Sequence, residues 1–174
     1  MPVPFVYMDE EVKERMHADL NNALKNAVTA HSKNLVRLAF TYTKNVQDAE
    51  DIVQEVFFTY LDKAPAFADE VHEKAWLIRV TANKCKDALR KRKNAPLPLS
   101  EDIVSLPPEE RTVLFAVLEL EDKYRLPLHL HYYEGYSIAE IARILQANPA
   151  TVGSWLQRGR ALLKNQLGGD TDVR

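Results

Sequence analysis

The chain has 174 residues, of which 46% are hydrophobic, and a formal net charge of −2. This length suits one ordinary domain or two small ones, with enough apolar residues to form a core. The slightly negative charge excludes a protein that is basic throughout, so any site for a polyanion must come from local segregation of positive charge.

Residues 10–61 have apolar residues at helical spacing in three sets, which predicts three helices. The sets are Leu20, Leu24 and Ala27; Leu35, Leu38 and Ala39; and Ile52, Val53, Val56, Phe57 and Tyr60. Asn45 is a turn residue before the third helix, and Asp48 is predicted to cap that helix by accepting its free N–H groups. Pro65 interrupts the pattern, so we expect a loop over residues 62–73.

Helical spacing resumes at residues 74–93, where the predicted apolar face comprises Trp76, Leu77, Val80, Cys85 (or Ala82) and Leu89. Residues 95–108 are rich in proline and lack periodicity, which is typical of a linker. Residues 109–120, 124–133, 137–145 and 149–167 are predicted to be helical. The sequence therefore predicts an all-α protein in which two small helical domains, residues 10–94 and 109–167, are joined by a Pro-rich linker, residues 95–108.

The charges are segregated along the chain. Residues 48–62 include five acids and no Lys or Arg, whereas residues 74–93 include eight cations and one acid, Asp87. Residues 95–122 include seven acids and one arginine. Pairing within the helix cannot neutralise the basic block, and a polyanion would remove the repulsion and release counterions. The alternative for this segment is a solvated amphipathic helix.

The pattern in residues 136–164 is typical of a helix-turn-helix, the second predicted domain's main motif. The side chains predicted to point inward are Ile138, Ile141, Ala142 and Leu145 in the first helix, and Val152 and Leu156 in the second. Pro149 suits the first turn of the second helix, and Thr151 and Ser154 lie near the end that would enter a major groove. Arg158, Arg160 and Lys164 are available to phosphates. A helical hairpin with a solvated cationic face is the alternative.

Several classes of function are disfavoured. Cys85 is the only cysteine, so no intramolecular disulfide can form, and we expect a cytoplasmic protein with no membrane insertion. Asp51 and Glu55 can share a helix face but lack further ligands for a metal, while His129 and His131 are about 200° apart on a helix. No phosphate-binding loop or nucleophile motif occurs. We therefore expect no enzyme activity, no cofactor, no metal and no small-molecule substrate.

The order of these segments resembles the extracytoplasmic-function sigma factors, the small two-domain members of the sigma-70 family of bacterial RNA polymerase. "NLVRLAFTYTKNVQDAEDIVQEVFFTYL" is similar to their polymerase-binding segment, and "KAWLIRVTANKCKDALRKRK" to their minus-ten helix. "YRLPLHLHYYEGYSIAEIARILQANPATVGSWLQRGRALLK" is similar to their minus-thirty-five domain. The resemblance covers roughly residues 20–167 and implies a transcription initiation factor that binds core polymerase, directs it to promoters and helps to melt the minus-ten element.

The resemblance, together with the residue patterns, implies three sites. It implies that the core polymerase-binding residues are Asp48, Asp51, Gln54, Glu55 and Phe58. The minus-ten residues are Phe67 and Trp76, which support a flipped-out base, and Arg79, Asn83, Lys84, Lys86, Arg90, Lys91, Arg92 and Lys93, which hold DNA strands. The minus-thirty-five residues are Thr151, Ser154, Trp155, Arg158, Arg160 and Lys164.

The sequence departs from the family pattern in the second domain. Gly153 and Trp155 stand where the recognition helix commonly has cations, so the phosphate or base contacts that those two cations would make are absent. Gln146 stands where the turn usually has glycine, so a left-handed conformation there costs roughly 1 kcal/mol. The resemblance also implies an anti-sigma factor as a partner, one that would hold the chain at the membrane if it is anchored there. The alternative function is a stand-alone helix-turn-helix regulator that binds DNA without polymerase.

Overall fold

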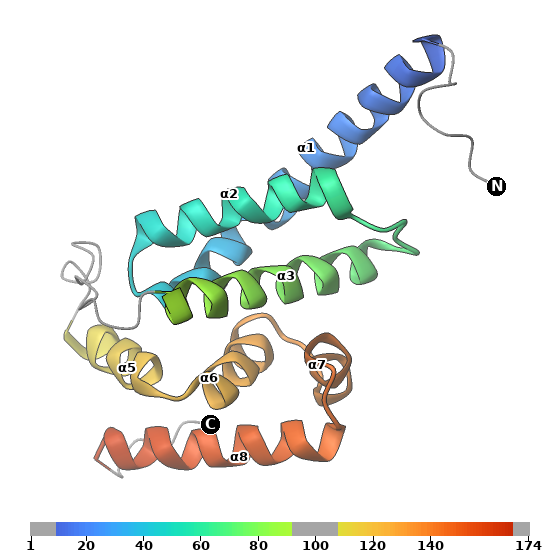
Figure 1. The fold of residues 1–174 in the computed structure, drawn as a ribbon. Helices are drawn as coiled ribbons and strands as arrows, with labels where there is room; N and C mark the ends of the chain where they lie inside the picture. The colour runs from blue at the N-terminus through green and yellow to red at the C-terminus, as the bar shows by residue number, and fades with distance from the viewer. Residues whose placement is uncertain (1–9, 92–107, 169–174) are drawn as a thin grey trace.

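The computed structural model describes residues 10–91 and 108–168, and every regular element in these ranges is a helix. The first domain comprises α1 (Glu10–Thr43), α2 (Val46–Lys63) and α3 (Glu70–Lys91). The second comprises α5 (Pro108–Glu119), α6 (Asp122–Leu128), the π-helical segment η2 (His129–Tyr133), α7 (Ile138–Leu145) and α8 (Pro149–Gln166). Figure 1 shows the second domain beneath α3, with α8 on its far side. The predicted all-α, two-domain fold is confirmed, while the predicted linker lies outside the described residues except for Pro108.

α1 is one continuous helix where the sequence predicted two. The two predicted helices rested on separate apolar sets, one ending at Ala27 and the next beginning at Leu35. His31 nevertheless continues the stripe, since it lies four residues from each of them and is only 9% exposed. The stripe therefore repeats every three or four residues without interruption, and the helix is continuous. The N-terminal part of α1 projects well beyond α2 and α3 (Figure 1).

Asn45, and not Asp48 as predicted, caps α2. The Asn45 side chain accepts a hydrogen bond from the backbone N–H of Asp48 at 3.0 Å, and the Lys44 before it has a φ of 57°. Asp48 lies in the first turn, where its carboxylate still complements the positive end of the helix dipole. Because α2 continues to Lys63 and α3 begins at Glu70, the predicted loop shortens to residues 64–69.

The buried face of α3 is rotated from the predicted one. It comprises Leu77, Ile78, Thr81, Ala82 and Cys85, whereas Trp76, Val80 and Leu89 are half-buried at its margins. Thr81 was missed because its side chain is polar. Its hydroxyl donates to the backbone oxygen of Leu77 at 2.8 Å, which satisfies the group inside the core.

Arg125 organises the start of the second domain. Its side chain is buried, and Nη1 donates to the backbone oxygens of Leu118 at 2.8 Å and Leu120 at 3.0 Å, at the end of α5. Nη2 also bonds to the Asp122 carboxylate in the first turn of α6. These bonds satisfy carbonyl groups that a helix end leaves without partners, and they set the turn between α5 and α6.

The predicted helix over residues 124–133 is α6 followed by η2. η2 ends at Tyr133, and the chain turns at Gly135, whose φ of 76° is a left-handed conformation that glycine adopts at little cost. The Tyr136 N–H then donates to the Leu130 oxygen at 3.0 Å, which closes the segment. This change of helical geometry determines the direction of Glu134, the residue that follows η2.

α8 approaches α6 closely at Gly159. A Cβ at this position would lie 2.8 Å from Leu128 Cδ1 and 3.3 Å from both Leu128 Cγ and Tyr124 Cβ. At Gly153, earlier in the same helix, a Cβ would meet nothing within 4 Å. The two glycines of α8 are thus equivalent in backbone conformation but opposite in packing.

We predict opposite effects of alanine at these two glycines. Gly153→Ala should raise the free energy of unfolding by about 0.5–1 kcal/mol, because alanine favours the helix and nothing opposes the methyl group. Gly159→Ala should lower it by about 0.5–2 kcal/mol, because overpacking of about 1–3 kcal/mol exceeds that gain. Urea denaturation followed by circular dichroism measures both. Equal stabilisation by the two variants would contradict the close packing of α6 and α8.

Candidate polymerase and nucleic-acid interfaces

The outer face of α2 is acidic with an aromatic side chain at one end. Asp51, Gln54, Glu55 and Phe58 are all exposed and follow one another at helical spacing, so they share one face. Phe58 is 68% exposed, which is unusual for a large apolar side chain on a packed helix. Asp48, one turn before them, is half-buried. This arrangement forms a continuous surface that can contact another protein.

The margin of this face meets α3 through one ion pair. Lys84 Nζ lies 3.4 Å from Glu55 Oε2, and both side chains line a shallow groove together with Phe58. Exposed pairs of this kind contribute about 0–1 kcal/mol, so the pair leaves both side chains available to a partner. The structure thus brings Lys84, predicted to contact DNA, next to a residue predicted to contact polymerase.

An aromatic cluster fills the junction between α2, the loop at residues 64–69 and α3. The Phe67 ring stacks on Tyr60 with centroids 5.9 Å apart and contacts Trp76 edge-on at 5.8 Å. The Tyr60 hydroxyl donates to Glu73 Oε1 at 2.5 Å, and burial together with this bond raises the pKa of Tyr60 to about 12. Phe67 and Trp76 remain half-buried, so each ring keeps one accessible part.

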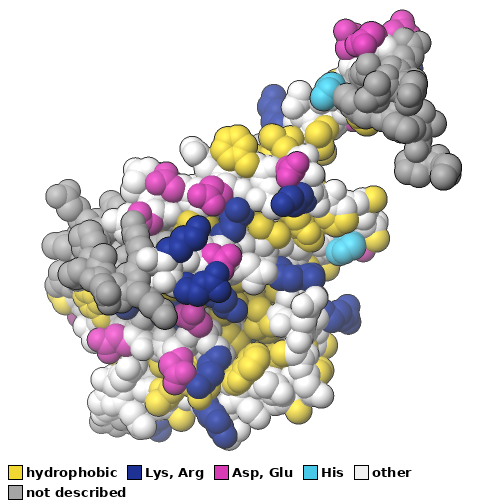
Figure 2. Space-filling model, viewed as in Figure 1, with side chains coloured by type: hydrophobic (Ala, Val, Ile, Leu, Met, Phe, Trp, Pro, Cys, Tyr) yellow, Lys and Arg dark blue, Asp and Glu magenta, His cyan; other side chains and the backbone are white. Residues whose placement is uncertain are grey.

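Four side chains predicted to hold DNA form a single stripe on α3. Arg79, Asn83, Lys86 and Arg90 are separated by four, three and four residues, which places them on the same side of the helix. Arg79 is half-buried, and the other three are exposed. Lys91 is exposed as well, while Arg92 and Lys93 lie outside the described residues. Lysine and arginine side chains also gather over the middle of the face shown in Figure 2.

α7 and α8 form the predicted helix-turn-helix. Ser137 caps α7 in a reciprocal arrangement with Glu140, and Asn148 caps α8 by accepting from the Ala150 N–H at 2.9 Å. Gln146 takes the expected left-handed conformation, with a φ of 53°. Val152 and Leu156 are buried as predicted.

The inward face of α7 differs from the predicted one. Ile141 and Ala142 are buried and Leu145 is half-buried, but Ile138 is 38% exposed, and Ile144, which was not predicted to point inward, is buried. Ile138 is the first residue of α7, where the chain has only just turned away from Tyr136. A residue in a first helical turn has fewer neighbours, so helical periodicity alone overestimates its burial.

The predicted DNA-contacting residues of α8 divide between two sides. Thr151, Ser154 and Arg158 are exposed and share one face, with the half-buried Trp155 beside them. Arg160 and Lys164 lie on the other side of the helix by their spacing, and Arg160 Nη1 donates to the Tyr132 hydroxyl at 2.9 Å. The structure therefore does not bring Arg160 and Lys164 together with the residues at the groove-entering end.

The sequence did not predict a role for several polar residues that lie between the two domains. Glu134, which follows η2, is brought together with Asn34 of α1 and Lys74 of α3, and the His129 side chain is buried beside them. The only local signals were a glutamate within an aromatic stretch and a lysine at the start of the basic block. Neither signal indicates a contact, because Asn34 and Glu134 are 100 residues apart in the chain.

The described residues include neither a metal-binding cluster nor a helix able to span a membrane. Residues 10–91 and 108–168 contain no group of three or more His, Cys, Asp or Glu side chains placed to hold a metal ion. In the same ranges no helix, the long α1 included, combines the length and the apolar character that crossing a bilayer requires. Cys85 is buried, and burial with the nearby Asp122 charge raises the pKa of its thiol to about 12.

Comparison with known families gives two matches. The model for "Sigma-70 region 2" matches residues 27–95, and that for "Sigma-70, region 4" matches residues 110–163. RNA polymerase sigma factor SigV of Bacillus subtilis is 31% identical over 150 residues, which cover 83% of this chain and 90% of that protein. ECF RNA polymerase sigma factor SigM of Mycobacterium tuberculosis is 31% identical over 144 residues, which cover 79% of this chain and 74% of that protein.

Two solved structures share the fold. Sigma factor RpoE from Bartonella quintana, in complex with the anti-sigma factor NepR, has a TM-score of 0.69 and 21% identity, and covers 84% of this chain and 98% of its own. CnrH, in complex with the cytosolic domain of CnrY, also has a TM-score of 0.69, with 23% identity, and covers 87% of this chain and 91% of its own. These two comparisons show that the chain shares its fold, that is, its arrangement of helices, with both structures.

Proposed function

The chain belongs to the sigma-70 family of RNA polymerase sigma factors, in its extracytoplasmic-function group, and we propose that it works through the surfaces described above. It is a transcription initiation factor that binds core RNA polymerase and directs it to specific promoters. The single observation that carries the assignment is the occurrence, in order, of both sigma-70 regions in one chain. A stand-alone regulator is not favoured, because it would leave the outer face of α2 without a partner.

The outer face of α2 is the proposed polymerase-binding surface. Asp48, Asp51, Gln54, Glu55 and Phe58 combine carboxylates with one protruding aromatic ring. Acidic side chains steer a basic partner and fix its orientation, whereas an aromatic anchor contributes most of the affinity at such interfaces. Phe58 is therefore the proposed anchor of this contact.

The first domain is also the proposed reader of the minus-ten element. The half-buried rings of Phe67 and Trp76 would support a base taken out of the stack, an event that costs a few kcal/mol and needs a prepared pocket. The stripe that begins at Arg79 would follow the separated strand, and the end of α3 near Arg90 would meet duplex phosphates. One helix would thus meet both single-stranded and duplex DNA.

The second domain is the proposed reader of the minus-thirty-five element through the start of α8. Thr151, Ser154 and Arg158 form an exposed face at or near the N-terminal end of the helix, which suits entry into a major groove. Trp155 replaces a cation beside this face, and Gly153 leaves open space. We therefore propose fewer phosphate contacts from this domain, with Arg160 and Lys164 away from the groove.

We also propose a protein that inhibits the chain, and no catalytic activity of its own. An anti-sigma factor is the partner of RpoE in the solved complex that shares this fold, and a protein of that class would suit the same pair of domains here. We propose that the chain acts in the cytoplasm, where its polymerase and promoters are.

The proposed function predicts promoter-specific initiation. Purified chain added to bacterial core polymerase on genomic DNA of its own source should produce new transcripts, because core polymerase alone does not select promoters. The measurement is sequencing of transcript 5′ ends, and the new start sites should share two upstream elements. Transcripts that are unchanged by addition of the chain would refute the proposal.

A substitution at Phe58 tests the polymerase-binding surface. Phe58→Ala should weaken binding to core polymerase about tenfold or more, because an exposed aromatic anchor contributes more than about 1 kcal/mol to such an interface. Val71→Ala is the matched control, since Val71 is 61% exposed but lies on α3. Titration of core polymerase by fluorescence anisotropy measures both. Equal affinities of the two variants would exclude Phe58 as the anchor.

The salt dependence of promoter binding tests the basic end of α3. Replacing Arg90, Lys91, Arg92 and Lys93 with glutamine should flatten the plot of log affinity against log salt by about 0.9 for each phosphate that is no longer neutralised. A Lys25→Gln, Lys33→Gln double variant on α1 is the control and should retain the slope, because both lysines are exposed outside the proposed DNA surface. The slope is measured with the polymerase complex on promoter DNA. An unchanged slope in the fourfold variant would remove the phosphate role.

A further inference from the structure

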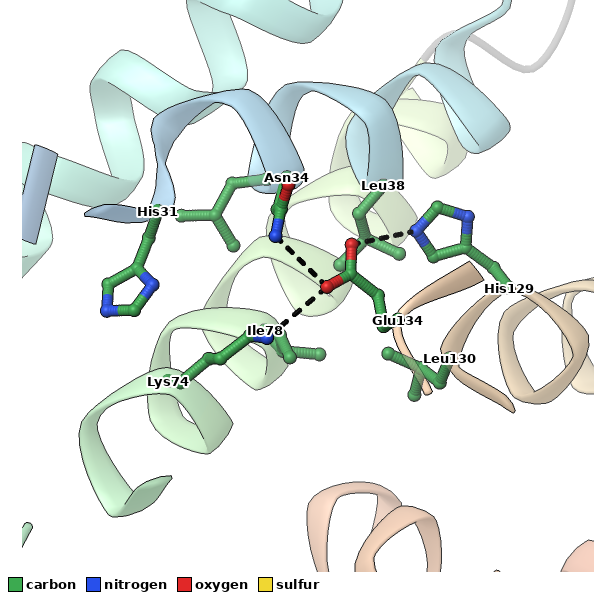
Figure 3. A pocket seen from close by; sticks show the side chains of 9 residues that line it. His31, Asn34, Leu38, Lys74, Ile78, His129, Leu130 and Glu134 are labelled. Carbon is green, nitrogen blue, oxygen red and sulfur yellow. Dashed lines mark hydrogen bonds and ion pairs between the residues drawn. The ribbon is translucent and has the colours of Figure 1, made fainter. Parts of the chain in front are cut away.

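A buried carboxylate joins the two domains. Glu134 follows η2 in the second domain, and its side chain is only 6% exposed. Its Oε2 accepts a hydrogen bond from Asn34 Nδ2 of α1 at 3.1 Å and lies 3.3 Å from Lys74 Nζ of α3. Figure 3 shows the carboxylate pointing from the second domain toward these two helices of the first.

The surroundings of Glu134 make this contact depend on closure of the domains. Leu38, Ile78 and Leu130 line the same small pocket, so the carboxylate lies among apolar side chains (Figure 3). A buried carboxylate is tolerated only when it is paired and hydrogen-bonded. Both partners that satisfy Glu134 Oε2 belong to the first domain, so the second domain cannot bury this group alone.

His129 does not replace these partners. Its Nε2 lies 3.8 Å from Glu134 Oε1, which is too long for a hydrogen bond. Burial lowers the pKa of His129, which the Glu134 charge opposes and the nearby Arg37 charge reinforces. The ion pair within the cluster is therefore the one between Glu134 and Lys74.

Contacts between cations and aromatic rings also connect the two domains, with cations from both of them. The Arg37 guanidinium of α1 lies 5.3 Å from the centre of the Tyr133 ring, and Lys74 Nζ lies 4.9 Å from that of Tyr136. In the opposite direction, Arg125 of α6 lies 5.3 Å from the centre of the Tyr42 ring on α1. Contacts of this type are worth about 0.5–2 kcal/mol in other proteins, so closure is supported at several points.

The closed arrangement does not match the spacing of promoter elements. A domain of about 80 residues has a radius of gyration near 12 Å, so two such domains in contact have centres about 30 Å apart. Elements named minus ten and minus thirty-five are about 25 base pairs apart, or about 85 Å at 3.4 Å per base pair. When fully extended, the chain between residues 91 and 108 adds at most about 60 Å to the distance between the domain centres. The two domains can therefore span about 85 Å only if they separate.

We propose that Glu134, held by Lys74 and Asn34, is a latch that keeps the free chain closed, and that binding of both promoter elements requires this latch to open. The regulatory part of the proposal rests on the proposed function, whereas closure of the free chain does not. Separation would expose the carboxylate and the ammonium group to water, where each is solvated independently. Any partner that competes for Lys74 or Asn34 would then favour the open form.

The closure is tested first in the free chain, without polymerase. Cysteines introduced at Val71 on α3 and Ala139 on α7, two exposed positions on helices that pack together, accept donor and acceptor dyes, because native Cys85 is buried. The labelled parent should show high energy transfer. Glu134→Gln should lower the energy transfer, because it leaves Lys74 without its counter-charge. Lys74→Glu should also lower it, because it places a second carboxylate beside Glu134.

A charge exchange and a matched control complete this test. The double variant Lys74→Glu, Glu134→Lys should restore the energy transfer, which a merely unfolded variant would not do. Glu109→Gln removes an exposed carboxylate of the same domain and should leave the energy transfer unchanged. Equal transfer in the parent and in Glu134→Gln would overturn the latch whatever transcription shows.

Transcription then tests whether the latch regulates the chain. With core polymerase held constant, unlabelled Glu134→Gln should reach half-maximal initiation at a concentration about tenfold lower than the parent, because apparent affinity is reduced by the fraction of competent molecules. A variant that opens in the energy-transfer assay but retains the parent's dose dependence would overturn the regulatory role. A parent chain that initiates no transcripts would contradict the proposed function, and energy transfer would still decide whether the latch exists.

Discussion

Burial of the apolar stripe on α1 is the interaction on which the first domain depends. Leu35 and Leu38 of this stripe are 2% exposed and pack with α2 and α3, and truncation of such a leucine to alanine typically costs about 2–5 kcal/mol. A packed helix buries one side and leaves the other in water. The positions of the acidic face of α2 and of the basic stripe of α3 therefore follow from which sides α1 covers.

The second domain depends on a different constraint, the close approach of two backbones. Gly159 lets α8 lie against α6, and Arg125 holds the turn that brings α6 to this place. With the inner side of α8 fixed by Val152 and Leu156, the side that includes Ser154 faces outward. The outer face of α8, the proposed DNA-reading face, is thus positioned by residues that lie away from it.

The contact between the domains combines features of a core and of a reversible interface. Leu130 is fully buried there, as in a core, but the group beside it is the ionised pair of Glu134 and Lys74. Apolar packing favours closure without selecting one arrangement, whereas a buried charge is satisfied only when its partners return to the same places. A chain that must use its two domains both together and apart benefits from an interface whose polar groups water can satisfy after separation.

The sequence alone determined the helical class, most of the helices, the division into two domains and the family. These features depend on local patterns, namely helical periodicity, proline content and motifs in order, so they were predictable. Local patterns were misleading where a polar residue occupies a buried position, as His31 does in α1 and Thr81 does in α3. They also misassigned the cap of α2 to Asp48, whereas Asn45 provides it.

Only the tertiary structure decided which side chains act together. It separated Arg160 from the outer face of α8, enclosed Phe67 among aromatic rings and joined Asn34 to Glu134 across 100 residues of chain. The physical reason is that periodicity reports which side of a helix is buried but not which helix covers it. That choice depends on the packing of the whole chain.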